Sequence, residues 1–210
     1  MVEWREKVAR EKRAAFAEET YWGRPVPGFG DPEAGTVLLG LAPAAHGANR
    51  TGRFFTGDRS GDFLFAALHR TGFANQPTSR SKDDGLCLEG LWISAAVRCA
   101  PPQNKPTPGE RNACLPYAAR ELELLPEPRA MLCLGAFAWD AALRLFEVRP
   151  KPKFGHGAEH EVGEITLLGC YHVSQQNTFT GVLTPGMLDS VLLRARELGS
   201  PPRRPGRLSW

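Results

Sequence analysis

The sequence predicts a single three-layer α/β domain, in which a central, mostly parallel four-stranded sheet is flanked by helices. Short apolar runs alternate with longer segments of helical spacing, the pattern of parallel strands that helices cover on both faces. A length of 210 residues suits one domain, and a hydrophobic fraction of 42% suffices for its core. We expect the domain to span residues 1–199 and a flexible basic tail to follow over residues 200–210.

Four segments have the composition of strands buried on both faces, because Val, Ile, Leu and small residues dominate them. They cover residues 36–41, 91–97, 129–134 and 165–171. Amphipathic helices are predicted where apolar residues recur three and four positions apart. These helices cover residues 2–18, 61–72, 109–125, 137–148 and 185–198.

Proline and glycine mark where these elements begin and end. Thr107 and Thr184 each precede a proline, so both are predicted to be helix N-caps with proline at the first helical position. Residues 23–35 and 150–163 are rich in glycine and proline and are predicted to be loops. Because these two segments are predicted to be loops, the sequence predicts four strands in total.

Charge and hydropathy exclude several classes of protein. A formal net charge of +3 is too small for a protein that coats nucleic acid by charge alone. No apolar run approaches the length of a membrane span, and residues 1–13 are too charged for a signal peptide. The five cysteines form no CxxC pair, so structural disulfides are not expected. We expect a cytoplasmic protein without a membrane partner.

Three unusual segments follow predicted strands, at the carboxyl ends where open α/β sheets bind ligands. They are GLAPAAHGANRTGRFFTGD at residues 40–58, AAVRCAPPQNKPTPGERNAC at residues 95–114 and YHVSQQNTFTG at residues 171–181. The glycine-rich first segment can bring backbone N–H groups close to an anion or a base edge. It lacks the glycine spacings of dinucleotide and triphosphate sites, and a merely structural loop is the alternative.

Together these segments resemble the three signature regions of the family 5 uracil-DNA glycosylases, in the same order and at similar separations. The resemblance extends to RPVPGFGDPEA at residues 24–34 and covers nearly the whole chain. It implies the fold of that superfamily and an enzyme of base-excision repair, which hydrolyses the bond between a damaged base and deoxyribose. The implied substrate is double- or single-stranded DNA, and we expect a nucleoid-associated monomer that leaves an abasic site.

The resemblance provides three catalytic candidates. His172 matches a histidine that contacts the base carbonyl, where a hydrogen bond strengthens as the departing base becomes anionic. Asp58 matches an aspartate that positions or activates water, and an N-cap for the following helix is an equally weighted alternative. Asn104 matches an asparagine near the substrate pocket and could equally be a turn residue.

The resemblance also places residues around the base. Phe55 matches the aromatic residue that stacks on the extruded base, and Gly40 and Ala42 lie beside it in the first segment. Many uracil-specific relatives have aspartate or asparagine in place of Ala42, and an asparagine that reads uracil in place of Ala95. Selectivity requires buried polar groups that must be paired, so their loss implies a broad range of substrates. Uracil, hypoxanthine, xanthine and ethenocytosine are all expected.

Several polar residues are candidates for contact with DNA. The segment from residue 174 to 181 would enter the duplex or fill the gap left by the flipped nucleotide, and a plain hydrogen-bonded loop is the alternative. The candidates are Asn49, Arg50, Gln175, Gln176 and Asn177. A non-catalytic DNA-binding protein derived from this fold is the rival hypothesis, which the missing polar residue at Ala42 favours. Retention of Asp58, Asn104 and His172 favours the enzyme.

The cysteines depart from the family pattern. Relatives bind a 4Fe–4S cluster through four cysteines, of which two form an N-terminal CxxC and two correspond to Cys99 and Cys114. Only the second pair is present. Either the natural chain begins further upstream, or the cluster has been lost and Cys99 and Cys114 remain as buried small residues or weak ligands. In the family the cluster is structural, so the chemistry is expected to need no cofactor.

Overall fold

The central strands form a sheet whose two faces are both buried. In the computed structural model, which describes residues 1–201, side chains alternate between the faces. Leu38 packs in one core, while its neighbours Val37 and Leu39 pack in the other. Four parallel strands confirm the predicted ones, in the spatial order β3-β2-β4-β6. They are β2 (Thr36–Gly40), β3 (Leu91–Ala95), β4 (Ala130–Leu134) and β6 (Ile165–Cys170).

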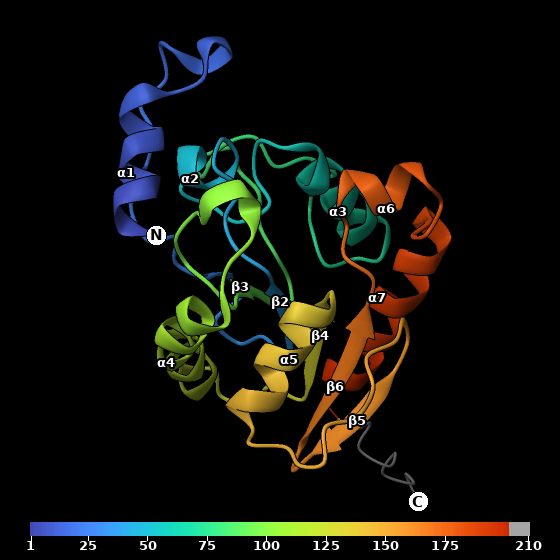
Figure 1. Cartoon of the computed structure of the whole chain (residues 1–210). Coiled ribbons are helices and arrows are strands. Elements are labelled where there is room, and N and C mark those ends of the chain that lie inside the picture. Colours follow the sequence, from blue (N-terminus) through green and yellow to red (C-terminus); the bar gives the residue numbers. More distant parts are fainter. Residues whose placement is uncertain (202–210) are drawn as a thin grey trace, which may run out of the picture.

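Helices cover both faces of this sheet, which gives the predicted three layers (Figure 1). One layer consists of α3 (Arg59–Arg70) and α7 (Pro185–Gly199), which pack against each other. The other consists of α4 (Pro108–Leu124) and α5 (Ala136–Leu145). Both predicted caps are confirmed, because the side chain of Thr107 accepts from Glu110 N and that of Thr184 accepts from Met187 N.

Two further strands form the edges of the sheet, so the predicted count of four strands was too low. The order of all six is β1-β3-β2-β4-β6-β5, and both edge strands are antiparallel to their neighbours. Both lie in segments predicted as loops. β1 (Phe29–Gly30) has only two residues, and β5 (Glu159–Val162) has charged, exposed positions that a fully buried strand would lack. Edge strands need not carry a continuous apolar run.

The N-terminal helix is shorter than predicted. α1 (Val2–Glu11) ends where Lys12 takes a φ of 55°, and a 3-10 turn, η1 (Ala14–Phe16), follows. Three short elements interrupt segments that were predicted to have no helix: α2 (Ala48–Thr51), η2 (Pro102–Asn104) and α6 (Gln175–Phe179). No helix within residues 1–201 is long and apolar enough to cross a membrane. Most of the predicted basic tail, residues 202–210, lies outside the described residues.

Candidate active site

A cavity of about 270 Å³ lies where β2, β3 and β6 reach their carboxyl ends. Parallel α/β sheets bind ligands at this edge, because the loops that leave the strands converge there. All three predicted catalytic residues and all four predicted base-pocket residues contribute to its wall. They are Asp58, Asn104, His172, Gly40, Ala42, Phe55 and Ala95. The sequence order had separated them by more than one hundred positions, and the fold brings them together.

Phe55 lies in this wall with a strained backbone. Its φ of 53° is in the left-handed region, which costs a residue other than glycine on the order of 1–3 kcal/mol. Two glycines allow the conformation. A Cβ on Gly61 would lie 1.8 Å from the Phe55 carbonyl oxygen, and a Cβ on Gly40 would lie 2.8 Å from Cζ of the ring. The ring therefore rests directly on the end of β2.

Asp58 is the N-cap of α3, as one of its two predicted roles requires. Its Oδ1 accepts a hydrogen bond from the backbone N–H of Gly61 at 2.9 Å. Burial raises the pKa of Asp58 above its usual value, although the N–H groups of Gly61 and Ser60 oppose that shift. Its Oδ2 lies beside Gly47, where a Cβ would approach it to 2.4 Å. Because a carboxylate has two oxygens, capping leaves the second free to meet a water, and that role stays a prediction.

His172 follows β6 and is held there by its neighbours. The side-chain amide of Asn177 donates to the backbone carbonyl of His172 at 2.8 Å. Gly135 has a φ of 90°, and a Cβ on it would lie 3.2 Å from the Cβ of His172, so the chain passes closely there. Burial lowers the pKa of His172 below its usual value. The imidazole is therefore neutral at pH 7, with one ring N–H available as a donor.

Asn104 is exposed at the rim of the cavity. It has a φ of 56°, and the preceding residue, Gln103, has a φ of 55°. Its backbone N–H donates to Pro101 O at 3.2 Å, so it is part of a tight turn in η2. Asn104 borders both the cavity and a neighbouring groove. Its predicted turn and pocket positions are therefore compatible.

A groove of about 570 Å³ adjoins the cavity and contains residues predicted to contact DNA. Gln175 and Gln176 are exposed on α6 and line it. The groove also contains Arg13 and Arg59, both exposed, which the three motifs do not include. Arg13 belongs to a basic run near the N-terminus, for which the sequence favours a solvated helix face over an arm that contacts phosphates. Arg59 directly follows Asp58, and this position beside a catalytic candidate is the feature of the sequence that could have indicated a contact with DNA.

The structure assigns the other three predicted DNA contacts to internal tasks. Asn49 is fully buried, and its Nδ2 donates to Arg5 O at 3.2 Å, which joins α2 to α1. The Arg50 guanidinium donates to His46 O at 2.9 Å and Gly57 O at 3.1 Å, and it also pairs with Glu19. Asn177 holds His172. Full burial removes Asn49 from the predicted DNA interface. Arg50 and Asn177 are half-buried, and their contact with DNA stays a prediction.

Comparison with known proteins identifies the family of this chain. The model of the family described as the uracil DNA glycosylase superfamily matches residues 27–194. This chain belongs to that superfamily, in its type-5 branch.

Type-5 relatives come from distant organisms. The type-5 uracil-DNA glycosylase of Mycobacterium bovis is 57% identical over 202 residues, which are 94% of this chain and 75% of that protein. The Thermus thermophilus protein of the same description is 54% identical over 200 residues, 94% of this chain and 90% of its own. The Pyrobaculum aerophilum protein is 43% identical over 195 residues, 93% and 84% of the two chains. The predicted family and its α/β fold are thereby confirmed.

The resemblance to the family implies an iron–sulfur cluster with four cysteine ligands. Cys99 and Cys114 correspond to two of these ligands. Cys99 and Cys114 are both buried. Burial raises the pKa of Cys114, and the nearby Cys99 contributes to that rise, so the two thiols are neighbours. Arg5 donates to Cys99 Sγ at 2.7 Å. Within the described residues no group of three or more His, Cys, Asp or Glu side chains could hold a metal. Residues 1–201 therefore do not assemble the four thiolates that a 4Fe–4S cluster takes.

Proposed function

We propose that this protein is a monofunctional DNA glycosylase of base-excision repair, which hydrolyses the N-glycosidic bond of uracil in DNA and leaves an abasic site. The relatives described above carry the name uracil-DNA glycosylase. The observation that supports this function most is the single cavity that contains Phe55, Asp58 and His172 at the carboxyl edge of the sheet. An aromatic surface, a carboxylate and a neutral hydrogen-bond donor are the three groups that the reaction needs.

Binding begins when the damaged nucleotide leaves the duplex, since its glycosidic bond is inaccessible in the base stack. The extruded base stacks on the ring of Phe55 at the end of β2. Gln175 and Gln176 lie in the adjoining groove, where the opened duplex would pass. Arg13 and Arg59 in the same groove are suited to contact phosphates.

The chemical step breaks the bond between C1′ of the sugar and the nitrogen of the base, whose electron pair leaves with the base. His172 donates its N–H to the base carbonyl oxygen, where negative charge develops. The carboxylate of Asp58 stabilises the cationic sugar and orients a water toward C1′. Oxygen of that water forms the new bond, and its proton passes to Asp58 or to solvent. Asn104, at the rim, helps to retain the water.

We infer that the product is an abasic site with an intact strand. Strand cleavage by a glycosylase begins when an amine forms a Schiff base with C1′. Among the described residues that line the cavity and its groove, none is a lysine. Water is therefore the nucleophile. A monomer suffices for this scheme, because all of the proposed groups belong to one chain.

The cavity also suits bases other than uracil. Ala42 and Ala95 present methyl groups, which neither donate nor accept hydrogen bonds and so do not distinguish between base edges. Phe55 offers a stacking surface that every base can use. We therefore propose hypoxanthine, xanthine and ethenocytosine as further substrates.

Replacing Ala95 with asparagine should narrow this range. Asparagine can pair with the O4 and N3–H of uracil. Hypoxanthine offers the same pattern at O6 and N1–H, but its fused ring system is larger, so the added amide leaves it less room in the cavity. We expect the ratio of kcat/KM for uracil over hypoxanthine to rise about tenfold, the effect of a small steric misfit in a closed pocket. Single-turnover assays of the wild type and Ala95→Asn on both substrates would show an unchanged ratio if Ala95 does not face the base edge.

Alkaline cleavage tests the proposed function directly. Purified protein is incubated with duplexes that contain one uracil, hypoxanthine or xanthine, and the products are separated with and without alkali. We expect strand breaks at the lesion only after alkali. Breaks without alkali would contradict the monofunctional mechanism. Tight binding with no product from any duplex would refute the glycosylase and favour a DNA-binding protein without catalysis.

A further inference from the structure

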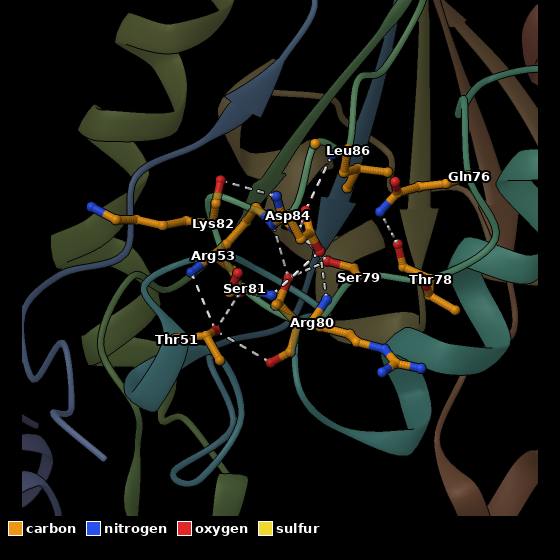
Figure 2. Close-up of polar contacts among 12 residues, drawn as sticks. Thr51, Arg53, Gln76, Thr78, Ser79, Arg80, Ser81, Lys82, Asp84 and Leu86 are labelled. Atoms are coloured by element: carbon orange, nitrogen blue, oxygen red, sulfur yellow. Dashed lines mark hydrogen bonds and ion pairs between the residues drawn. The ribbon is translucent and has the colours of Figure 1, made fainter.

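A buried arginine joins two segments that lie far apart in the chain (Figure 2). The side chain of Arg53 is almost inaccessible, with 6% of the residue exposed. Its Nη2 donates to Ser79 Oγ at 2.7 Å and to both carboxylate oxygens of Asp84 at 2.8 Å. Its Nε donates to Thr56 Oγ1 at 3.1 Å. One guanidinium thus connects residues 51–57 with residues 76–86.

Asp84 is as firmly held as its arginine partner. Its Oδ2 accepts from the backbone N–H groups of Arg80 at 2.7 Å and Ser81 at 3.3 Å, and its Oδ1 accepts from Leu86 N at 3.2 Å. Burial opposes ionisation, but these N–H groups and Arg53 outweigh it and hold the pKa of Asp84 below its usual value. Residues 76–86 are therefore folded around a carboxylate that stays charged. A guanidinium suits this site better than an ammonium does, because Nη2 reaches both carboxylate oxygens while Nε bonds to Thr56.

The same contacts fix the backbone on both sides of Phe55. Thr56, which follows it, shares a hydrogen bond of 2.6 Å with Ser79 Oγ and bonds to Phe54 O at 3.1 Å. The next residue, Gly57, donates its N–H to Ser79 O at 3.4 Å. A left-handed conformation at a residue other than glycine persists only where its surroundings determine it. These surroundings are the hydrogen bonds that Arg53 and Asp84 organise.

We propose that the Arg53–Asp84 pair is a positioning clamp, which aims the Phe55 ring into the cavity. This inference rests on the proposed glycosylase function. Neither residue of the pair lines the cavity, so both act through the loop between them and the reacting atoms. Small displacements of such groups reduce rates strongly, because the reaction requires close alignment.

Asp84→Asn tests the clamp while preserving shape. In either orientation its amide puts an N–H donor against Arg53 Nη2 and against a backbone N–H, that of Leu86 or that of Arg80, so these bonds are lost. We expect single-turnover uracil release to slow about tenfold, with affinity for undamaged duplex unchanged. Arg53→Lys keeps the charge but cannot bond to Asp84, Ser79 and Thr56 at once, and it should slow the reaction similarly. Arg70→Ala is the matched control, since it removes a two-bond pair with Asp189 on the surface and should leave the rate unchanged.

A double substitution separates positioning from a general loss of structure. If the clamp acts through Phe55, then Asp84→Asn should change the rate little in a Phe55→Ala background, where no ring remains to be aimed. An equal slowing in both backgrounds would overturn the inference, as would a wild-type rate in Asp84→Asn and Arg53→Lys. An inactive wild type would refute the proposed function itself and the clamp with it. Thermal unfolding of each variant ensures that the rates are compared between folded proteins.

Discussion

Asp58→Asn should slow uracil release about 10³-fold and leave the protein at least as stable as the wild type. Asparagine is as good an N-cap as aspartate, so its side-chain oxygen can still accept from Gly61 N. It cannot take a proton from water or stabilise a cationic sugar by charge. The substitution therefore separates the two roles of this side chain. Single-turnover rates and thermal unfolding of the same preparations measure both.

The pH dependence of stability provides a second test of the buried carboxyl group of Asp58. Because burial raises the pKa of Asp58 in the folded state, its contribution to stability is present below the unfolded pKa and is lost as pH rises through the folded pKa. Asp58→Asn has no carboxyl group to ionise, so it does not lose this stability. We expect the Tm of Asp58→Asn to rise relative to the Tm of the wild type as pH increases from the unfolded to the folded pKa of Asp58. The wild-type rate should rise with pH, with its inflection above the usual aspartate value of 3.8.

Asp58→Ala is the control, because it removes both the charge and the cap. Loss of an N-cap costs about 1 kcal/mol, so this variant should unfold at a lower temperature than Asp58→Asn while being equally slow. If Asp58→Asn released uracil at the wild-type rate, Asp58 would be only a cap. A rate that falls in both variants in proportion to their stability would lead to the same conclusion.

The buried elements of this fold were predictable because their signal is local. Each central strand is a short apolar run, and α3, α4 and α7 each begin at a side-chain cap, the last two at Thr107 and Thr184 before a proline. The edge strands were not predictable, because β5 alternates exposed and half-buried residues and is held by pairing with β6. Pairing partners are set by the tertiary fold and leave no period in the sequence.

The site shows the same division. The residues that line the cavity could be proposed from motifs, since they are concentrated in three short segments after strands. The burial of Asn49 could not be predicted, because the sequence does not distinguish a buried asparagine from an exposed one. Only the packing of α1 over α2 shows that Asn49 is buried. The Arg53–Asp84 pair could not be predicted either, because its members are 31 positions apart in the sequence and no helix or strand relates them. Only the folded chain shows that both belong to the support of Phe55.

His172→Ala should slow uracil release about 10²–10³-fold, the effect of removing one donor from a developing anion. The binding of undamaged duplex should not change. Burial lowers the pKa of His172, so the wild-type imidazole is neutral at pH 7 and above. We therefore expect no inflection from His172 between about pH 7 and 8.5 in the wild-type profile. His160→Ala is the matched control, because that histidine lies on the edge strand β5, away from the cavity.

The leaving group provides the sharpest test of this role. Fluorine at C5 makes the uracil anion more stable by itself, so 5-fluorouracil depends less on a donor from the protein. His172→Ala should consequently lose less activity on 5-fluorouracil than on uracil, when single-turnover rates are compared on otherwise identical duplexes. Equal losses on the two substrates would mean that His172 holds the base in place without stabilising its negative charge. In that case the electron pair of the broken bond would have to be stabilised by another group in the cavity wall.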